Sequence, residues 1–441
     1  MSSVFYRNLN KNYPRAVRSD GMYIYDETGK SYLDMSGGAA VSCLGHQHPR
    51  VTNALCSQIQ RMSFAHTAFF SNEPQEQLAS LLADKFAEAG ARVYFTAGGS
   101  EANETAIKMA WQYWRTRGQH KKTKIISRVH SYHGNTFAAL SASGNLPRRR
   151  DMGDLLIEWP RIEPCYAYRH QREDESEAAY SMRSASALER VIQAEGADTI
   201  AAFIAEPVVG ASLGVVPATS GYFAKIREIC DRHDIVLIAD EIMCGSGRTG
   251  TFFAHEQDGF LPDIVTMAKG IAGGYQPLAA TLARAKIHKV FASSKSGFAH
   301  GHTYVGHASS CSAGLAVIRT IDEEGLLDNV QHYGKQLHAA LKDAFAEHPF
   351  IGDIRGRGLF RGLEIVADRH SKKPFDDDLK ITSHLHQLTM KHGLICYPGG
   401  GSARDRLGSH ILLAPPYILA DIHIEQLIEK LQTIFAELFD V

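Results

Sequence analysis

The feature of this sequence that most restricts its fold is a series of short apolar runs separated by helical patterns. The runs lie at residues 93–96, 200–205, 235–239 and 264–268, and they contain many Ile, Val and Ala residues. Apolar runs of about four to eight residues with β-branched side chains are typical of strands that are buried on both faces. Such strands occur in parallel sheets with helices on either side.

The segments between these runs carry the spacing of amphipathic helices. Residues 101–115 are one example, with apolar side chains at positions i, i+3, i+4 and i+7 of one predicted face: Ile107, Ala110, Trp111 and Trp114. Strands that alternate with helices predict an α/β fold with a mostly parallel sheet, in which ligands bind at the carboxyl ends of the strands.

The two ends of the chain have a different pattern. Residues 22–35 predict a β-hairpin, and residues 421–438 predict an amphipathic helix. We therefore expect two domains, a large one over 61–320 and a smaller α+β one formed jointly by 1–60 and 321–441. The crevice between two such domains is a natural ligand site.

Charge and composition argue against several classes of partner. The chain has 47 basic and 48 acidic residues, a balance that favours neither nucleic acid nor an anionic membrane surface, and we expect Arg148–Arg150 to be a solvated loop. No stretch approaches the roughly 20 apolar residues of a membrane span, and the N-terminal residues lack the apolar core of a signal peptide. The seven scattered cysteines, with no CxxC pair, are typical of free thiols in a reducing cytoplasm.

Histidines occur in two close pairs, His46 with His48 and His300 with His302. Neither pair has the helical spacing or the neighbouring cysteines of a zinc site. We expect structural or hydrogen-bonding roles for them, and we predict no metal site.

Two predicted strand ends carry residues suited to binding an anion or holding a charge. Ala97–Glu101 (AGGSE) lies between a strand and a helix, where flexible glycines and the free N–H groups of the helix start can hold a phosphate. An ordinary turn with a helix cap is the alternative. Asp240 ends the most apolar run, where an unpaired charge is costly, and a cap or a buried ion pair is the alternative reading.

Lys269 ends the next apolar run along the chain. Burial lowers the pKa of a lysine and makes it a better nucleophile or imine-forming amine, whereas a lysine that extends into solvent is the alternative. A phosphate cradle, an acid and a lysine at neighbouring strand ends are together what pyridoxal-5′-phosphate (PLP) requires. The lysine binds the aldehyde, and the acid keeps the pyridine nitrogen protonated so that the ring accepts electrons.

These residues lie in motifs that resemble those of class III aminotransferases, which have fold type I among PLP enzymes. The resemblance extends from LGHQHP near the start to APPYIL near the end, and the motifs between them keep the expected order: AGGSEANETAIKMA, HSYHGNT, AEPVVGASLG, IADEIMCGSGRTG, MAKGIAGGYQPLAA and GHTYVGHASSCSAGLA. It implies PLP as the cofactor and a large domain whose mostly parallel, seven-stranded sheet lies between helices.

The resemblance also implies roles for individual residues around the cofactor. Gly99 and Ser100 match the phosphate-binding turn. Tyr132 matches the aromatic residue that stacks on the pyridine ring, with His133 and Gly134 beside it.

Further matches concern the reacting end of the cofactor and the partner subunit. Glu206 matches an acid near the cofactor, Asp240 the partner of the pyridine nitrogen, and Ile242 the aliphatic residue behind the ring. Lys269 matches the lysine that binds PLP as a Schiff base, and Thr303 matches the threonine that reaches the phosphate of the partner subunit. This last match implies a homodimer, or a larger assembly, with shared active sites.

Two positions differ from the 4-aminobutyrate and ornithine members of the family. Those enzymes have a second acid in the pattern EPVxGE and an arginine before the late proline motif, which together distinguish substrates with and without an α-carboxylate. Here the two positions hold Ala211 and Leu412, and Met243 stands where a Gln is frequent. Because both charges are missing, neither is left unpaired. The combination is similar to ω-amine and ω-amino acid:pyruvate transaminases.

Those transaminases bind the keto acid carboxylate with a mobile arginine upstream of the proline motif. The segment GGGSARDRLGSH offers Arg406 and Arg404, and the spacing favours Arg406. Two solvated arginines are the alternative. Phe69, with Phe70 and Tyr166, is a candidate for the substrate pocket, although aromatic residues are more often part of the core.

The implied reaction moves an amino group from a primary amine or ω-amino acid to a keto acid, with pyruvate favoured over 2-oxoglutarate, by a ping-pong mechanism. A decarboxylating transaminase, an aminomutase or a racemase is the alternative, because one fold supports several reactions. A non-catalytic binding protein is a further alternative, against which the intact set of Asp240, Lys269 and Thr303 argues.

Overall fold

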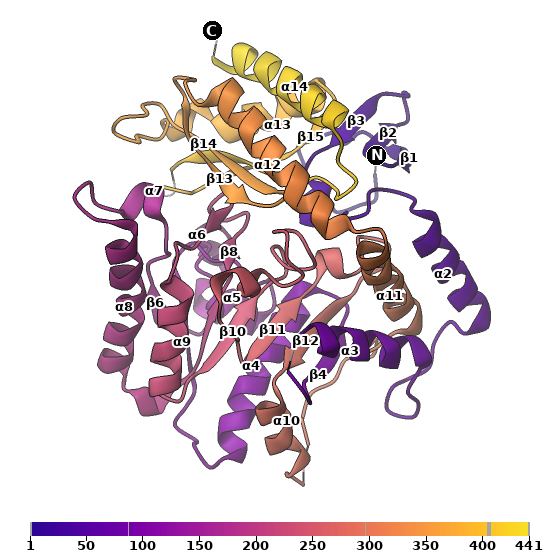
Figure 1. Cartoon of the computed structure of the whole chain (residues 1–441), viewed down its shortest axis with the longest axis vertical. Helices are drawn as coiled ribbons and strands as arrows, with labels where there is room; N and C mark the ends of the chain where they lie inside the picture. The colour runs from indigo at the N-terminus through magenta and orange to yellow at the C-terminus, as the bar shows by residue number, and fades with distance from the viewer. Residues whose placement is uncertain (1, 87, 296, 404–406, 440–441) are drawn as a thin grey trace.

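The centre of the molecule is a seven-stranded sheet flanked by helices (Figure 1). The structure is a computed structural model that describes residues 2–86, 88–295, 297–403 and 407–439. Across the sheet the strand order is β4 (Arg92–Thr96), β12 (Ala279–Ala283), β11 (Ile264–Met267), β10 (Val236–Asp240), β7 (Ile200–Ala205), β5 (Lys124–Arg128) and β6 (Arg161–Ile162). β12 runs antiparallel to β11 and β4, and the other neighbouring strands are parallel, which confirms the predicted α/β fold with a mostly parallel sheet.

The predicted apolar runs form strands at the middle of this sheet. Every residue of β7 and β10 is buried, as expected for strands with helices on both faces. β12 was not predicted, because its sequence AATLA contains a single large apolar side chain and resembles a helical segment as much as a strand.

Helices cover the two faces of the sheet: α3 (Glu73–Lys85), α4 (Gly99–Thr116), α8 (Glu177–Glu195), α9 (Tyr222–Arg232), α10 (Ala285–Ala292) and α11 (Ala308–Glu323). The predicted inner face of α4 is correct for Ile107, Ala110 and Trp114, which are buried. It is wrong for Trp111, which lies at the edge of the apolar stripe, is 37% exposed, and donates its indole N–H to the Thr123 carbonyl at 2.7 Å.

The two ends of the chain meet above the carboxyl ends of the large sheet (Figure 1). The predicted hairpin is present as β2 (Tyr23–Asp26) and β3 (Ser31–Asp34), and β3 also pairs in parallel with β15 (Leu394–Ile395) near the other end of the sequence. β1 (Ala16–Asp20) completes this sheet. A second sheet has the order β13 (Ile351–Arg357), β14 (Phe360–Ile365), β17 (Ser409–Leu413) and β16 (Tyr397–Gly400).

The helices of the chain ends are α2 (Pro49–Arg61), α12 (Leu326–Phe345), α13 (Ile381–Lys391) and α14 (Asp421–Phe439). α14 covers the predicted C-terminal helix and packs against α12 and α13, whereas α2 packs against α11. The proposed division into 61–320 and a second domain from both ends stays a prediction.

The remaining elements are short: α1 (Gly37–Ala40), α5 (Phe137–Ala142), α6 (Leu146–Arg149), α7 (Ala167–His170), β8 (Val208–Val209), β9 (Val216–Pro217), η1 (Arg150–Leu155), η2 (Ala197–Thr199), η3 (Ala254–Asp258), η4 (Lys269–Ile271) and η5 (Asp377–Leu379). The predicted solvated loop at 148–150 is wrong for Arg149. Its guanidinium is buried, donates to the carbonyls of Leu140 and Ser141 at 2.9 Å, and pairs with Glu158 at 2.5 Å. The fold brings Leu140, Ser141 and Glu158 to Arg149, and the local sequence pattern does not predict these contacts.

The described residues contain no helix that is long and apolar enough to cross a membrane.

All seven cysteines are free, and Cys56 is exposed while the others are buried. In the part of the chain that the structure describes, His, Cys, Asp and Glu residues form no group of three that could hold a metal ion. His46 lies 3.3 Å from Asp34, and His300 lies 2.9 Å from the hydroxyl of Thr105, so both take part in hydrogen bonding.

Candidate active site

A cavity of about 470 Å³ opens at the carboxyl ends of β4, β10 and β11. Nearly all of the predicted cofactor residues line it: Gly99, Ser100, Tyr132, His133, Gly134, Glu206, Asp240, Ile242 and Lys269. The cavity continues into a larger cleft of about 820 Å³, and both spaces are bordered by Tyr132, Ala211, Met243 and Lys269. The parallel strands thus bring together residues that are far apart in the sequence.

Lys269 begins η4, with Ala268 between it and the end of β11, and its backbone has a φ of 52°. This left-handed conformation is unfavourable for a residue with a Cβ by about 1 kcal/mol and is found most often at functional sites. The side-chain amine donates to the Ala39 carbonyl at 3.0 Å. Burial lowers the pKa of Lys269 to about 8, and repulsion from Arg7 adds to this effect while attraction to Asp240 opposes it. A larger share of this amine than of an ordinary lysine is therefore neutral and nucleophilic near neutral pH.

Asp240 ends β10, and its carboxylate is buried and held from three sides. Oδ2 accepts a hydrogen bond from the Asn103 side chain at 2.7 Å and lies 2.7 Å from Nδ1 of His133. Oδ1 accepts from the backbone N–H of Ile242 at 3.1 Å. The carboxylate is therefore fixed in orientation at the floor of the cavity.

Asn103 is a site residue that the sequence analysis missed. Besides Asp240, its amide donates to the His133 carbonyl at 2.7 Å, and its oxygen accepts from the Thr266 hydroxyl at 2.7 Å. It is fully buried on the inner face of α4, one turn after Gly99. The sequence does contain a signal for this role, because Asn103 is a polar residue on an otherwise apolar helix face. A polar group that is buried needs hydrogen-bond partners.

Two glycines shape the part of the cavity at the start of α4. A Cβ on Gly99 would lie 2.9 Å from Ile242, and a Cβ on Gly134 would lie 2.6 Å from the hydroxyl of Ser100. Gly134 also has a φ of 139°, which L side chains rarely adopt. The first N–H groups of a helix have no partners within it and carry the positive end of its dipole, so this corner suits a phosphate.

Glu206 supports the backbone of Tyr132. One of its oxygens accepts the Tyr132 N–H at 3.1 Å, and the other lies 3.0 Å from the guanidinium of Arg128. Burial alone would raise the pKa of Glu206, but the charges of His133 and Arg128 together with backbone hydrogen bonds hold it below its usual value. Arg128, buried at the end of β5, was also missed, because its pairing with Glu206 depends on tertiary structure.

Two of the predicted site residues that the structure describes, Thr303 and Phe69, do not line this cavity. Thr303 is exposed, and Phe69, between α2 and α3, is 81% exposed. Arg404 and Arg406 lie outside the described residues. The prediction that Tyr166 lines the substrate pocket is wrong. Tyr166 is buried in the core and donates its hydroxyl to Glu364 at 2.8 Å.

The two positions that distinguish this chain from the 4-aminobutyrate enzymes lie in one apolar cluster. Leu412 of β17 is fully buried in it, and Ala211 and Met243 pack against it. The Ala211 carbonyl lies 3.1 Å from Nε2 of His410, and burial lowers the pKa of that histidine to about 4, so it is neutral near pH 7. This wall of the cavity therefore carries no charge to bind a carboxylate.

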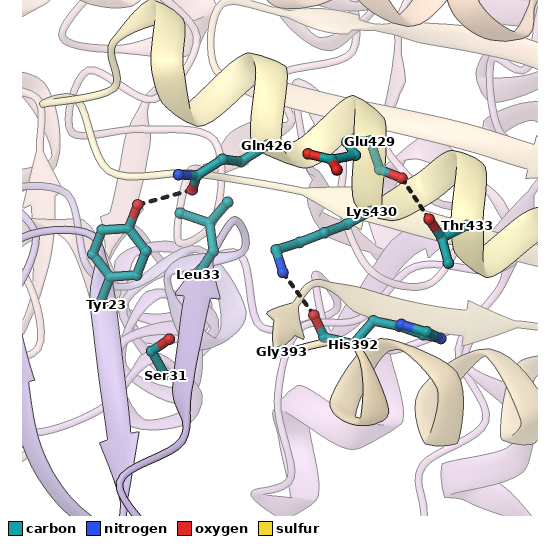
Figure 2. Close-up of a pocket in the computed structure, with 9 residues that line it drawn as sticks. All are labelled: Tyr23, Ser31, Leu33, His392, Gly393, Gln426, Glu429, Lys430 and Thr433. Carbon is teal, nitrogen blue, oxygen red and sulfur yellow. Dashed lines mark hydrogen bonds between the residues drawn. The ribbon is translucent and has the colours of Figure 1, made fainter.

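A separate cavity of about 420 Å³ lies between α14, β2 and β3 (Figure 2). Its polar groups bind one another: the Tyr23 hydroxyl donates to Gln426 at 2.8 Å, and the Lys430 amine donates to the His392 carbonyl at 2.7 Å. It contains none of the predicted cofactor residues.

The first cavity combines the groups that PLP needs: an amine of lowered pKa, a buried carboxylate and a glycine-bordered helix start. Comparison with known proteins agrees. The family pattern of the class-III aminotransferases matches residues 6–435. An uncharacterized aminotransferase of Schizosaccharomyces pombe is 40% identical, over 97% of this chain and 94% of its own length.

Solved structures of similar proteins share the whole fold. An (S)-enantioselective omega-transaminase from Thermomicrobium roseum superimposes with a TM-score of 0.91 at 35% identity, over 97% of this chain and 93% of the other. An omega transaminase from Pseudomonas jessenii in complex with PMP also superimposes with a TM-score of 0.91. It is 33% identical, and the match covers 97% of this chain and 93% of the other. The chain is therefore a PLP-dependent enzyme and belongs to the class-III aminotransferases.

Proposed function

We propose that this aminotransferase moves an amino group from a primary amine or an ω-amino acid to pyruvate by a ping-pong mechanism. The observation that carries the proposal is the meeting of Lys269, Asp240 and the start of α4 in one cavity whose substrate wall is apolar at Ala211 and Met243. The omega-transaminases among the similar structures support the same class of donor.

We further propose one role for each residue of the cofactor site. Gly99 and Ser100 hold the phosphate, Tyr132 and Ile242 pack on the ring, and Asp240 holds the proton on the pyridine nitrogen. His133, Gly134 and Glu206 support these groups. When bound, PLP supplies a ring that takes up negative charge from the amine-bearing carbon of the substrate.

Lys269 has two tasks in this proposal. It would bind PLP covalently at rest, and its freed Nζ would take the proton from the amine-bearing carbon of the donor and pass it to the cofactor rather than back to the donor. A pKa of about 8 suits both directions of transfer, because the amine is available as base and as acid near neutral pH. The amino group stays with the enzyme between the two halves of the reaction, which is the basis of ping-pong kinetics.

Substrate binding involves parts of the chain outside the cavity. We propose that Arg406, or Arg404, binds the keto acid carboxylate. Thr303 and Phe69, both exposed in the single chain, face a second subunit, so the proposed assembly is a homodimer with shared sites. The seven free cysteines support a cytoplasmic location.

Steady-state kinetics with one amine and two acceptors test this proposal. Formation of a free aldehyde or ketone, a higher kcat/KM for pyruvate than for 2-oxoglutarate, and parallel double-reciprocal lines are expected. Intersecting lines would contradict the ping-pong mechanism. Product formation beyond one equivalent per enzyme without any keto acid would favour an aminomutase or a racemase, and release of carbon dioxide would favour a decarboxylating transaminase.

A further inference from the structure

The outer cleft next to Lys269 contains an arginine that the reaction described above does not use. Arg148, on α6, is exposed, and its guanidinium lies 5.0 Å from the centre of the Tyr132 ring. Tyr132 and Lys269 line both the inner cavity and the outer cleft, whereas Arg148 lines the outer cleft alone. The guanidinium therefore lies further out along the cleft than the ring against which it rests.

Arg148 differs sharply from its neighbour in sequence. Arg149 is buried, paired with Glu158 and bonded to backbone carbonyls. No carboxylate among the described residues lies within ion-pair distance of Arg148. Its backbone N–H donates to the Asn145 side chain at 3.3 Å, which caps α6, and its side chain rests on the Tyr132 ring. A guanidinium that rests over an aromatic ring can still donate from its N–H groups to a carboxylate.

The other charges of the cleft favour an anion on this side. Arg7, from the N-terminal segment, lies close enough to affect the pKa of two groups of the cleft. Its charge repels the Lys269 ammonium and lowers the pKa of that lysine, and it opposes the rise in the Tyr132 pKa that burial causes, because it attracts the phenolate. Lys380 also lines the cleft. Among the described residues that line the cleft, the acids are Asp376 and Asp377, which come from the segment that precedes α13 and not from the side of Tyr132.

We propose that Arg148 determines donor specificity by binding the carboxylate of an ω-amino acid, at the end of the substrate away from the reacting amine. This inference rests on the proposed function and adds a donor class to it. A substrate whose amine reaches Lys269 extends along the cleft past Tyr132, where Arg148 lines the outer part. The apolar wall at Ala211 and Met243 then contacts the methylene groups between the two ends.

The test compares an ω-amino acid with the alkylamine of the same chain length, which lacks only the carboxylate. The rate at which each donor bleaches the cofactor absorption band is measured without a keto acid, for the wild type, Arg148→Ala and Arg148→Lys. Arg150→Ala is the matched control, because Arg150 is exposed, carries the same charge and does not line the cleft.

We expect Arg148→Ala to lower the second-order rate constant for bleaching by the amino acid by about tenfold or more, with less than a threefold change for the alkylamine. Arg148→Lys should recover part of the loss, and Arg150→Ala should behave as the wild type. Equal changes for both donors, or none for either, would overturn the inference. Because bleaching by the alkylamine reports on the transaminase reaction itself, failure of the proposed function would show as loss of both signals in the wild type.

Discussion

Nδ1 of His133 lies 2.7 Å from Oδ2 of Asp240, and both side chains are buried. The same oxygen accepts from Asn103, which also binds the backbone of His133, so the three residues form one closed network. In this network Asp240 is fixed by α4 and by the segment after β5, and not by its own strand alone. The proposed contact of Asp240 with the pyridine nitrogen therefore depends on positioning residues around it.

Replacement of Asn103 tests this dependence. Asn103→Ala removes a hydrogen bond to a carboxylate, which is worth about 1.5 to 3 kcal/mol, so the Kd for PLP should rise by about tenfold to a hundredfold. Titration of the cofactor-free protein with PLP measures it. Asn53→Ala, on the exposed face of α2, is the control. An unchanged Kd and an unchanged kcat in Asn103→Ala would argue against a positioning role.

The lowered pKa of Lys269 predicts how PLP attachment depends on pH. Attachment requires the neutral amine, so its rate should rise with pH and level off with a midpoint near pH 8, well below the value of about 10.4 for a free lysine. Stopped-flow absorbance of the cofactor-free protein gives this profile. Arg7→Ala should move the midpoint upward, because it removes a repelling charge. A midpoint near 10 in the wild type would be inconsistent with a buried Lys269.

Gly134 is predicted to tolerate no side chain. A Cβ there would lie 2.7 Å from the Cα of Ser100, and the φ of 139° is strained for alanine. Gly134→Ala should therefore displace the start of α4 and weaken PLP binding by about fivefold to a hundredfold, from roughly 1 to 3 kcal/mol of strain. Gly153→Ala, with no atom within 4 Å of the added Cβ, is the matched control. Equal PLP affinity in the two variants would show that the cavity has room for a side chain at Gly134.

Glu364 is predicted to stabilise the fold through a buried charge network. It accepts hydrogen bonds from Tyr166 and Ser402 and pairs with Arg169 and Arg355. Burial alone would raise its pKa, but the two arginines lower it to about 2. Since the folded pKa lies below the ordinary value, this stabilisation is complete above about pH 4.5 and is lost as the pH falls towards 2.

Glu364→Gln leaves the two arginines without their carboxylate and should lower the free energy of unfolding at pH 7 by about 3 to 5 kcal/mol. Urea denaturation at pH 7 and pH 3 measures the effect, which should be smaller at pH 3. Glu347→Gln, at a side chain that is 98% exposed, should change stability by less than about 0.5 kcal/mol. A loss of the same size at both pH values would contradict the charge explanation.

Much of the site was predictable because it lies at strand ends. The apolar runs locate β7, β10 and β11, and the residues that follow β10 and β11 include Lys269 at the cavity. β12 escaped prediction because a short Ala-rich strand has no periodic signal.

Partners distant in the sequence could not be predicted in the same way. Arg128 pairs with Glu206, and Arg149 is buried, only because separate segments meet in three dimensions. The exposure of Trp111 depends on which side of α4 faces the sheet. Local patterns predict that a residue is polar or apolar, but not which partner tertiary packing brings to it.

The most direct test of the account is the absorption spectrum of the purified protein with PLP, recorded for the wild type and for Lys269→Ala before and after an amine is added without a keto acid. We predict a yellow band in the wild type that borohydride fixes to the protein and that a donor amine bleaches, and no borohydride-fixed cofactor in Lys269→Ala. A wild type without the band, or a Lys269→Ala protein that still fixes PLP covalently, would contradict the assignment of Lys269 and the mechanism built on it.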